Sequence, residues 1–80
     1  MPNKQTYQIS DLGCAGAVIS AGANLLSLDR TDYKKVIFVF EYSFELETMI
    51  NDYWGKKLQV DARTFFENAA ALKTRIFNER

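Results

Sequence analysis

Residues 35–41 read Lys-Val-Ile-Phe-Val-Phe-Glu, and this stretch decides the fold of the 80-residue chain. Every residue between the two charged ends is β-branched or aromatic, a composition typical of a β-strand. Successive side chains of a strand point to opposite faces, which puts Val36, Phe38 and Phe40 on one face. Ile37 and Val39 lie on the other face, which is apolar too. We therefore expect the flanking helices or a second subunit to cover both faces.

The residues before this strand predict a partner for it. Residues 24–29 form a second strand with Leu26 and Leu28 on one face, and a polar connection over 30–34 joins the two in an antiparallel hairpin. A lone hairpin is barely stable, so helices, a third strand or a second subunit must support it. Residues 6–9 fit either a short strand or an extended arm.

The first of three predicted helices spans residues 12–21, where almost every side chain is small or apolar. Such a helix is buried on most sides. Ser10 supplies a capping hydroxyl and Asp11 a carboxylate for the first turn, while Gly22 suits a left-handed helix end. Glycines at 13 and 16 lower helix propensity, which predicts close approach of a neighbouring backbone.

Two further helices follow the hairpin. Ser43 caps the second, which ends at Gly55, and Asp61 caps the third, which runs to about residue 78. At 100° per residue the second helix has one apolar stripe: Leu46, Met49, Ile50, Tyr53 and Trp54. The apolar face of the third helix comprises Ala62, Phe65, Phe66, Ala69, Leu72, Ile76 and Phe77. The fold class is thus α+β: a small antiparallel hairpin or sheet packed with three helices, in the order (β)-α-β-β-α-α.

Length and composition set the other limits. Eighty residues fit one domain, 1–80, with 1–5 as a flexible lead-in. The chain has no histidine and a single cysteine, Cys14, so it lacks the residues of a disulfide, a Cys/His zinc site or a Ser–His pair. We expect Cys14 to be a packed core residue. The chain also lacks an apolar run long enough to cross a membrane. The sequence predicts a cytoplasmic, non-enzymatic protein with no cofactor, no metal and no membrane contact.

Charge is zero overall but unevenly distributed. Residues 1–54 contain seven acidic and four basic side chains, whereas residues 55–80 contain six basic and three acidic ones. A basic helix beside a basic turn fits a phosphate backbone, and an aromatic ring beside it fits a stacked base. The candidate nucleic-acid-binding residues are Trp54, Lys56, Lys57, Arg63, Lys73 and Arg75. The alternative is an ordinary solvated face, with Tyr53 and Trp54 serving their own helix.

Lys73 projects near the middle of the apolar face of the last helix. It faces a partner or an anion, or it pairs with Glu41 or Asp11, or its aliphatic stem covers the core while its amine reaches water. The last two interpretations are favoured, because lysine is seldom buried without a partner.

Several segments follow one another in a recognisable order along the chain: residues 7–12, Leu46, Tyr53–Trp54 and Phe65–Phe66, together with 36–41, 60–63 and 72–77. Their order resembles that of DUF5659, a bacterial and phage domain family of unknown function. The resemblance covers almost the whole chain, except that bulkier residues are expected at 13–16. It implies a small standalone domain, often from phage or other mobile elements, and implies no activity.

Two functions fit these observations. One is an accessory module that binds DNA or RNA through the basic residues above. The other is a protein-interaction or assembly module, homodimeric, that uses the sheet face or the face around Lys73.

Overall fold

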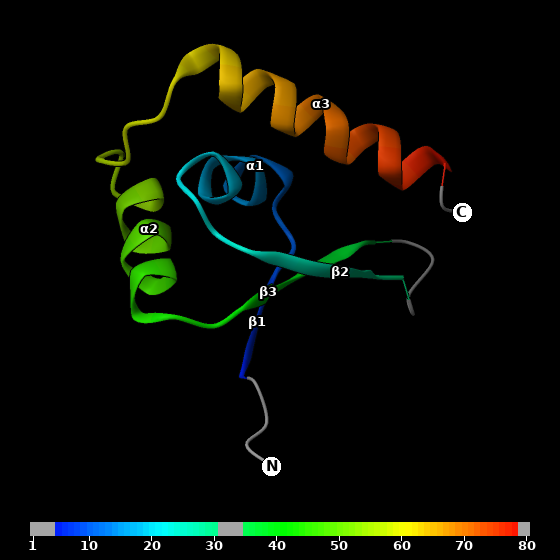
Figure 1. Cartoon of the computed structure of the whole chain (residues 1–80), viewed down its shortest axis with the longest axis horizontal. Coiled ribbons are helices and arrows are strands. Elements are labelled where there is room, and N and C mark those ends of the chain that lie inside the picture. The colour runs from blue at the N-terminus through cyan, green and yellow to red at the C-terminus, as the bar shows by residue number, and fades with distance from the viewer. Residues whose placement is uncertain (1–4, 31–34, 79–80) are drawn as a thin grey trace.

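A computed structural model describes residues 5–30 and 35–78 of the chain. The predicted order of elements is confirmed: β1 (Thr6–Ile9), α1 (Leu12–Ser20), β2 (Leu25–Asp29), β3 (Ile37–Glu41), α2 (Phe44–Trp54) and α3 (Ala62–Asn78) (Figure 1). Most of the predicted lead-in and of the predicted connection over 30–34 lies outside the described residues.

The sheet has three antiparallel strands in the order β1-β3-β2. The segment at 6–9 is therefore a strand, not a free arm, and β3 is the central strand. Phe38 lies opposite Ile9 of β1, and Phe40 lies opposite Tyr7. Phe38 and Phe40 keep 2% and 0% of their surface exposed. The strand with the clearest sequence pattern thus forms the centre of the core.

Strand β2 differs from its prediction, which placed Leu26 and Leu28 on one face. Leu25 lies opposite Phe40 and Leu28 opposite Phe38, with an irregularity in register between Leu25 and Ser27. This bulge adds one residue to β2 and breaks the alternation of side chains. Leu25 and Leu28 therefore pack against the core, while Leu26 is 42% exposed.

The core lies on only one face of the sheet, the face that carries Phe38 and Phe40. Ile37 and Val39, on the other face, are partly buried and do not belong to the core. The expectation that helices cover both faces is wrong. A central strand needs less cover than expected, because its neighbours shield it: Val39 lies between Gln8 of β1 and Ser27 of β2. Cover of this face by a second subunit stays a prediction.

Helix α1 lies between the sheet and α3, with α2 at its side (Figure 1). This position explains its small residues. A Cβ atom added to Gly16 would lie 3.4 Å from the Cβ atom of Ala69 in α3, so the two helices approach closely there, as predicted. Asn68, a polar residue of α3, also contacts α1. Its amide donates to Ser20 Oγ at 2.9 Å, and that hydroxyl donates to the Gly16 carbonyl at 2.8 Å.

The helix caps follow the sequence closely. Ser43 Oγ accepts from the Leu46 amide at 2.9 Å, and Asp61 Oδ2 accepts from the Thr64 amide at 2.9 Å. This bond lowers the pKa of Asp61, since it stabilises the ionised carboxylate. At α1 the cap is Asp11, whose Oδ2 accepts from the Cys14 amide at 2.8 Å, and not the expected Ser10. Gly22 has the predicted left-handed backbone, with φ of 109°.

Candidate functional site

All six residues proposed to bind nucleic acid are exposed. Three of them follow one another closely at the C-terminal end of α2, where Gly55 is the C-cap. Trp54 is 63% exposed, although it belongs to the apolar stripe predicted for this helix. Lys56 has a left-handed φ of 63° and donates its backbone amide to the Tyr53 carbonyl at 3.1 Å. Trp54, Lys56 and Lys57 therefore form one aromatic and basic corner, which we call the α2 corner.

The other three basic residues, all on α3, do not extend this corner into a continuous patch. Arg63 donates to its neighbour Glu67 at 3.1 Å, which neutralises its charge locally. Lys73 and Arg75 are two residues apart, about 200° around a helix that turns 100° per residue, so they point to nearly opposite sides. Of the six candidates, the fold brings together Trp54, Lys56 and Lys57.

Lys73 lies at the mouth of a mainly apolar groove between the start of α1 and one side of α3, with a volume of about 320 Å³. Its side chain is exposed, and among the described residues no ion pair joins it to Asp11 or Glu41. The arrangement agrees with an aliphatic stem over an apolar surface and an amine in water. The groove is lined by Leu12, Gly13, Phe65, Phe66, Ala69, Ala70 and Lys73.

Helix α3 buries only half of its predicted apolar face. Leu72 is buried, and Phe65, Ala69 and Ile76 are half-buried. In contrast, Phe66 is 71% exposed and Phe77 is 66% exposed, although both were expected on the packed side. At 100° per residue these two rings share one line along α3 with two other exposed residues. We call this line the α3 stripe: Phe66, Ala70, Lys73 and Phe77.

The width of the apolar face of α3 is the sequence signal that could have revealed this exposed surface. The apolar residues of α3 span about 140° of its circumference, wider than the contact with one neighbouring helix requires. Because α1 has only nine residues and mostly small side chains, it covers only one edge of that arc. Phe66, on the other edge, remains in solvent.

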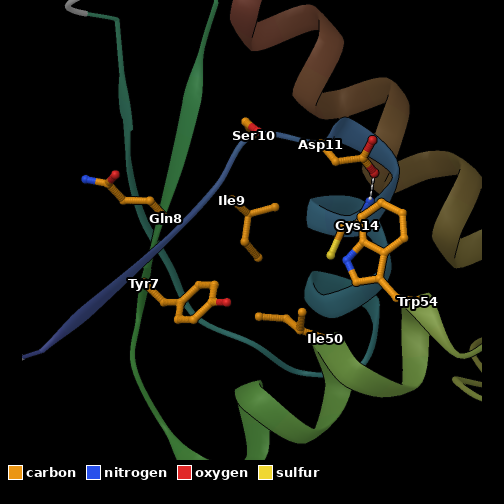
Figure 2. Close-up of a pocket in the computed structure, with 8 residues that line it drawn as sticks. All are labelled: Tyr7, Gln8, Ile9, Ser10, Asp11, Cys14, Ile50 and Trp54. Atoms are coloured by element: carbon orange, nitrogen blue, oxygen red, sulfur yellow. Dashed lines mark hydrogen bonds between the residues drawn. The ribbon is translucent and has the colours of Figure 1, made fainter.

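Cys14 and Tyr53 lie near the N-terminal cap of α1. Burial raises the pKa of the Cys14 thiol, and the Asp11 carboxylate raises it further. Burial also raises the pKa of Tyr53, with the charge of Asp11 again adding to the effect. Cys14 is 1% exposed, so the predicted core role is confirmed and the thiol is held in its unreactive, protonated form. Figure 2 shows Cys14 behind the ring of Trp54.

Within residues 5–30 and 35–78, no three carboxylate or cysteine side chains gather as a metal site would require. None of the helices described there has the length and hydropathy to cross a bilayer.

Comparison with known proteins identifies a family and goes no further. No match was found among curated proteins or among solved structures. Residues 4–78 match the family model described as a domain of unknown function, DUF5659. This match spans nearly the entire sequence and agrees with the resemblance drawn from residues 7–77. The chain belongs to the DUF5659 family.

Proposed function

We propose that this domain is a non-enzymatic, cytoplasmic assembly module, and that its partner is a second copy of itself bound along the α3 stripe. The observation that carries this proposal is the exposure of two large aromatic rings on a single helix beside an apolar groove. Large apolar groups rimmed by polar side chains mark interaction surfaces. A genomic setting in phage or other mobile elements, implied by the resemblance, is part of the same proposal, and neighbouring genes test it.

The spacing of the α3 stripe favours a second copy over an unrelated partner, because the stripe is self-complementary. Two α3 helices can pack antiparallel about a twofold axis that passes between Ala70 and Lys73. Phe66 then lies opposite the second copy's Phe77, and Ala70 lies opposite the second copy's Lys73. The two phenylalanine rings pack on each other, and the aliphatic stem of Lys73 packs on the small Ala70. A closed, isologous interface pairs the same patch of both subunits in this way.

Charge supports this arrangement. The chain has no net charge, so two copies do not repel one another at long range. Glu67 lies one helical turn before Ala70, the residue that Lys73 contacts on the second copy. The amine of Lys73 therefore approaches the second copy's Glu67, a carboxylate that already accepts from Arg63. A single helical face buries little surface compared with a stable dimer, so we expect association in the micromolar range.

Sedimentation velocity tests the proposal over about 1 µM to 1 mM, the range of weak interfaces. The wild-type chain is expected to shift from monomer to dimer within this range. Phe66→Ser is expected to weaken the dimer at least about tenfold, since it removes a large aromatic ring from the contact. Phe44→Ser is the matched control, because Phe44 is 74% exposed on α2, outside the stripe.

Circular dichroism checks that both variants remain folded, which their exposed positions predict. A wild-type chain that stays monomeric throughout would refute the proposal. Equal weakening by Phe66→Ser and Phe44→Ser would refute the assigned surface, because it would point to nonspecific association of apolar groups.

Nucleic-acid binding is the second candidate, and the exposed α2 corner is the observation that favours it. If it holds, a labelled oligonucleotide binds with an affinity that falls steeply with salt, by about tenfold or more between low and physiological ionic strength. Fluorescence anisotropy with single- and double-stranded DNA and RNA measures this. Joint replacement of Lys56 and Lys57 by glutamine should abolish binding, while Lys35→Gln, an exposed lysine elsewhere, should not. Absence of binding above micromolar background at low salt would exclude this candidate.

A further inference from the structure

The open edge of β1 lies beside a groove that is separate from the α3 stripe. This groove has a volume of about 190 Å³ and lies between β1 and the last turns of α2 (Figure 2). Ile9, Cys14 and Ile50 form its floor, and Trp54 and Tyr7 stand at its sides. Its far end is polar, with Ser10 and with Asp11, whose carboxylate also accepts from the Cys14 amide.

Strand β1 directs backbone N–H and C=O groups toward the open side of the sheet, along this groove. Among the described strands it is an edge, bonded to β3 on one side only. The Tyr42 amide donates to the Gln5 carbonyl at 2.8 Å, and in an antiparallel ladder such bonding alternates along the strand. Tyr7 and Ile9 therefore direct their backbone groups toward β3. The N–H and C=O groups of Thr6 and Gln8 point away from the sheet, where another strand would bind.

We infer that the β1 edge and its groove bind an extended peptide segment, which adds a fourth strand beside β1. Main-chain bonds to an open edge provide affinity in this mode, and pockets for alternate side chains provide specificity. Side chains of the added strand that face the helices enter the groove. The floor of Ile9 and Ile50 accepts one large apolar side chain, and the groove is too small for a second.

The negative charge at the polar end of the groove favours a basic residue at a second position of the peptide. Two positions along a strand, a side chain points to the same face. At that distance from the apolar residue, a lysine or arginine reaches both the Asp11 carboxylate and the face of Trp54. A cation over an indole ring is favourable, and the Trp54 ring is held by an edge contact with Tyr53 at a centroid distance of 5.0 Å. The ligand is thus a segment with a large apolar residue and a basic residue two positions apart.

The experiment uses a displayed library of random linear decapeptides, selected on the whole chain. Enriched peptides are expected to share the apolar and basic residues at that spacing. With one enriched peptide, backbone amide shifts should concentrate in residues 6–10 and the Trp54 indole. Selection that yields no enriched pattern, or one without the basic residue, would overturn the inference.

Three substitutions then test whether the peptide binds along the backbone of β1. Gln8→Pro removes the outward N–H at a position where an edge strand tolerates proline, and it should weaken binding at least about tenfold. Gln8→Thr keeps that donor and should bind as wild type. Asp11→Asn keeps the helix cap but loses the charge, so it should weaken binding severalfold, mainly for peptides with the basic residue.

Other occupants of this edge give distinct results. Phe66→Ser should leave peptide binding unchanged, so a failure of the proposed dimer and a failure of this inference are distinguishable. If Gln8→Pro alters sedimentation instead, a second copy covers β1 and the peptide assignment is wrong. If an oligonucleotide perturbs Trp54 and Gln8→Pro has no effect on it, Trp54 is a base-stacking residue and the inference fails.

Discussion

Phe40→Ala is expected to lower the free energy of unfolding by about 3–5 kcal/mol, the range for truncating a fully buried phenylalanine. Phe40 has no exposed surface and lies at the centre of the sheet, opposite Tyr7 on one side and Leu25 on the other. An 80-residue domain has a total stability of roughly 4–12 kcal/mol. The variant should therefore melt at least about 12 °C lower, and thermal denaturation followed by circular dichroism measures this.

Val39→Ala is the matched control for Phe40→Ala. Val39 is the preceding residue of the same strand, but its side chain lies on the face outside the core. We expect a loss of about 1 kcal/mol, since only a partly buried side chain is shortened. If Val39→Ala destabilised the protein as much as Phe40→Ala, the second face of the sheet would be covered in solution, and the one-sided packing described above would be wrong.

Gly16→Leu is expected to destabilise the protein by about 3 kcal/mol, at the upper end of the range for overpacking. At Gly16, α1 meets the backbone of α3, with Ala69 Cα at 3.5 Å and Phe65 Cε1 at 3.5 Å from an added Cβ atom. A leucine side chain extends well beyond that point. Helix α1 cannot move away to make room, because its other side packs on the sheet.

Gly16→Ala is the control that separates the size of the added side chain from the loss of glycine. Its single methyl group meets those atoms at ordinary contact distance, and alanine gains helix propensity of about 1 kcal/mol over glycine. We expect stability at or slightly above wild type, measured by urea unfolding. Ala71→Leu, at an exposed position of α3, controls for added bulk and should change stability by less than about 0.5 kcal/mol. A Gly16→Leu variant as stable as wild type would contradict the close approach of α1 and α3.

Elements with strong local signals could be predicted from the sequence. The β-branched and aromatic run in 35–41 predicted a strand, and the side-chain oxygens of Ser43 and Asp61 marked two helix starts that the structure confirms. Strand β2 was misread in detail, because its bulge depends on pairing with β3. The alternation of side chains along a single strand carries no information about the register of the partner strand, so Leu26 was assigned to the wrong face.

The candidate site was only partly predictable. Sequence patterning predicted that Cys14 is a core residue, which the structure confirms. It also placed Trp54 in the apolar stripe of its own helix, whereas the structure leaves 63% of Trp54 exposed. It did not reveal that Phe66 faces solvent, because a helical wheel shows which residues share a side but not how much of that side a neighbour covers. The groove beside β1 was not predicted either, since its walls come from three separate elements.

By itself, the sequence determined the order of elements, the strand within residues 35–41 and the membership of DUF5659, because periodicity, capping and motif order are properties of nearby residues. That this strand is the central one was decided by the pairing of β1 with it. Tertiary structure alone decided which apolar side chains are covered. Coverage depends on the size of a neighbouring element that is distant in the chain. Helix α1, with its small side chains, packs against Ala69 and leaves Phe66 exposed. The strands on either side of β3 shield Val39 without a helix above it. The surfaces that remain open by this packing, the α3 stripe and the β1 edge, are where we expect partners to bind.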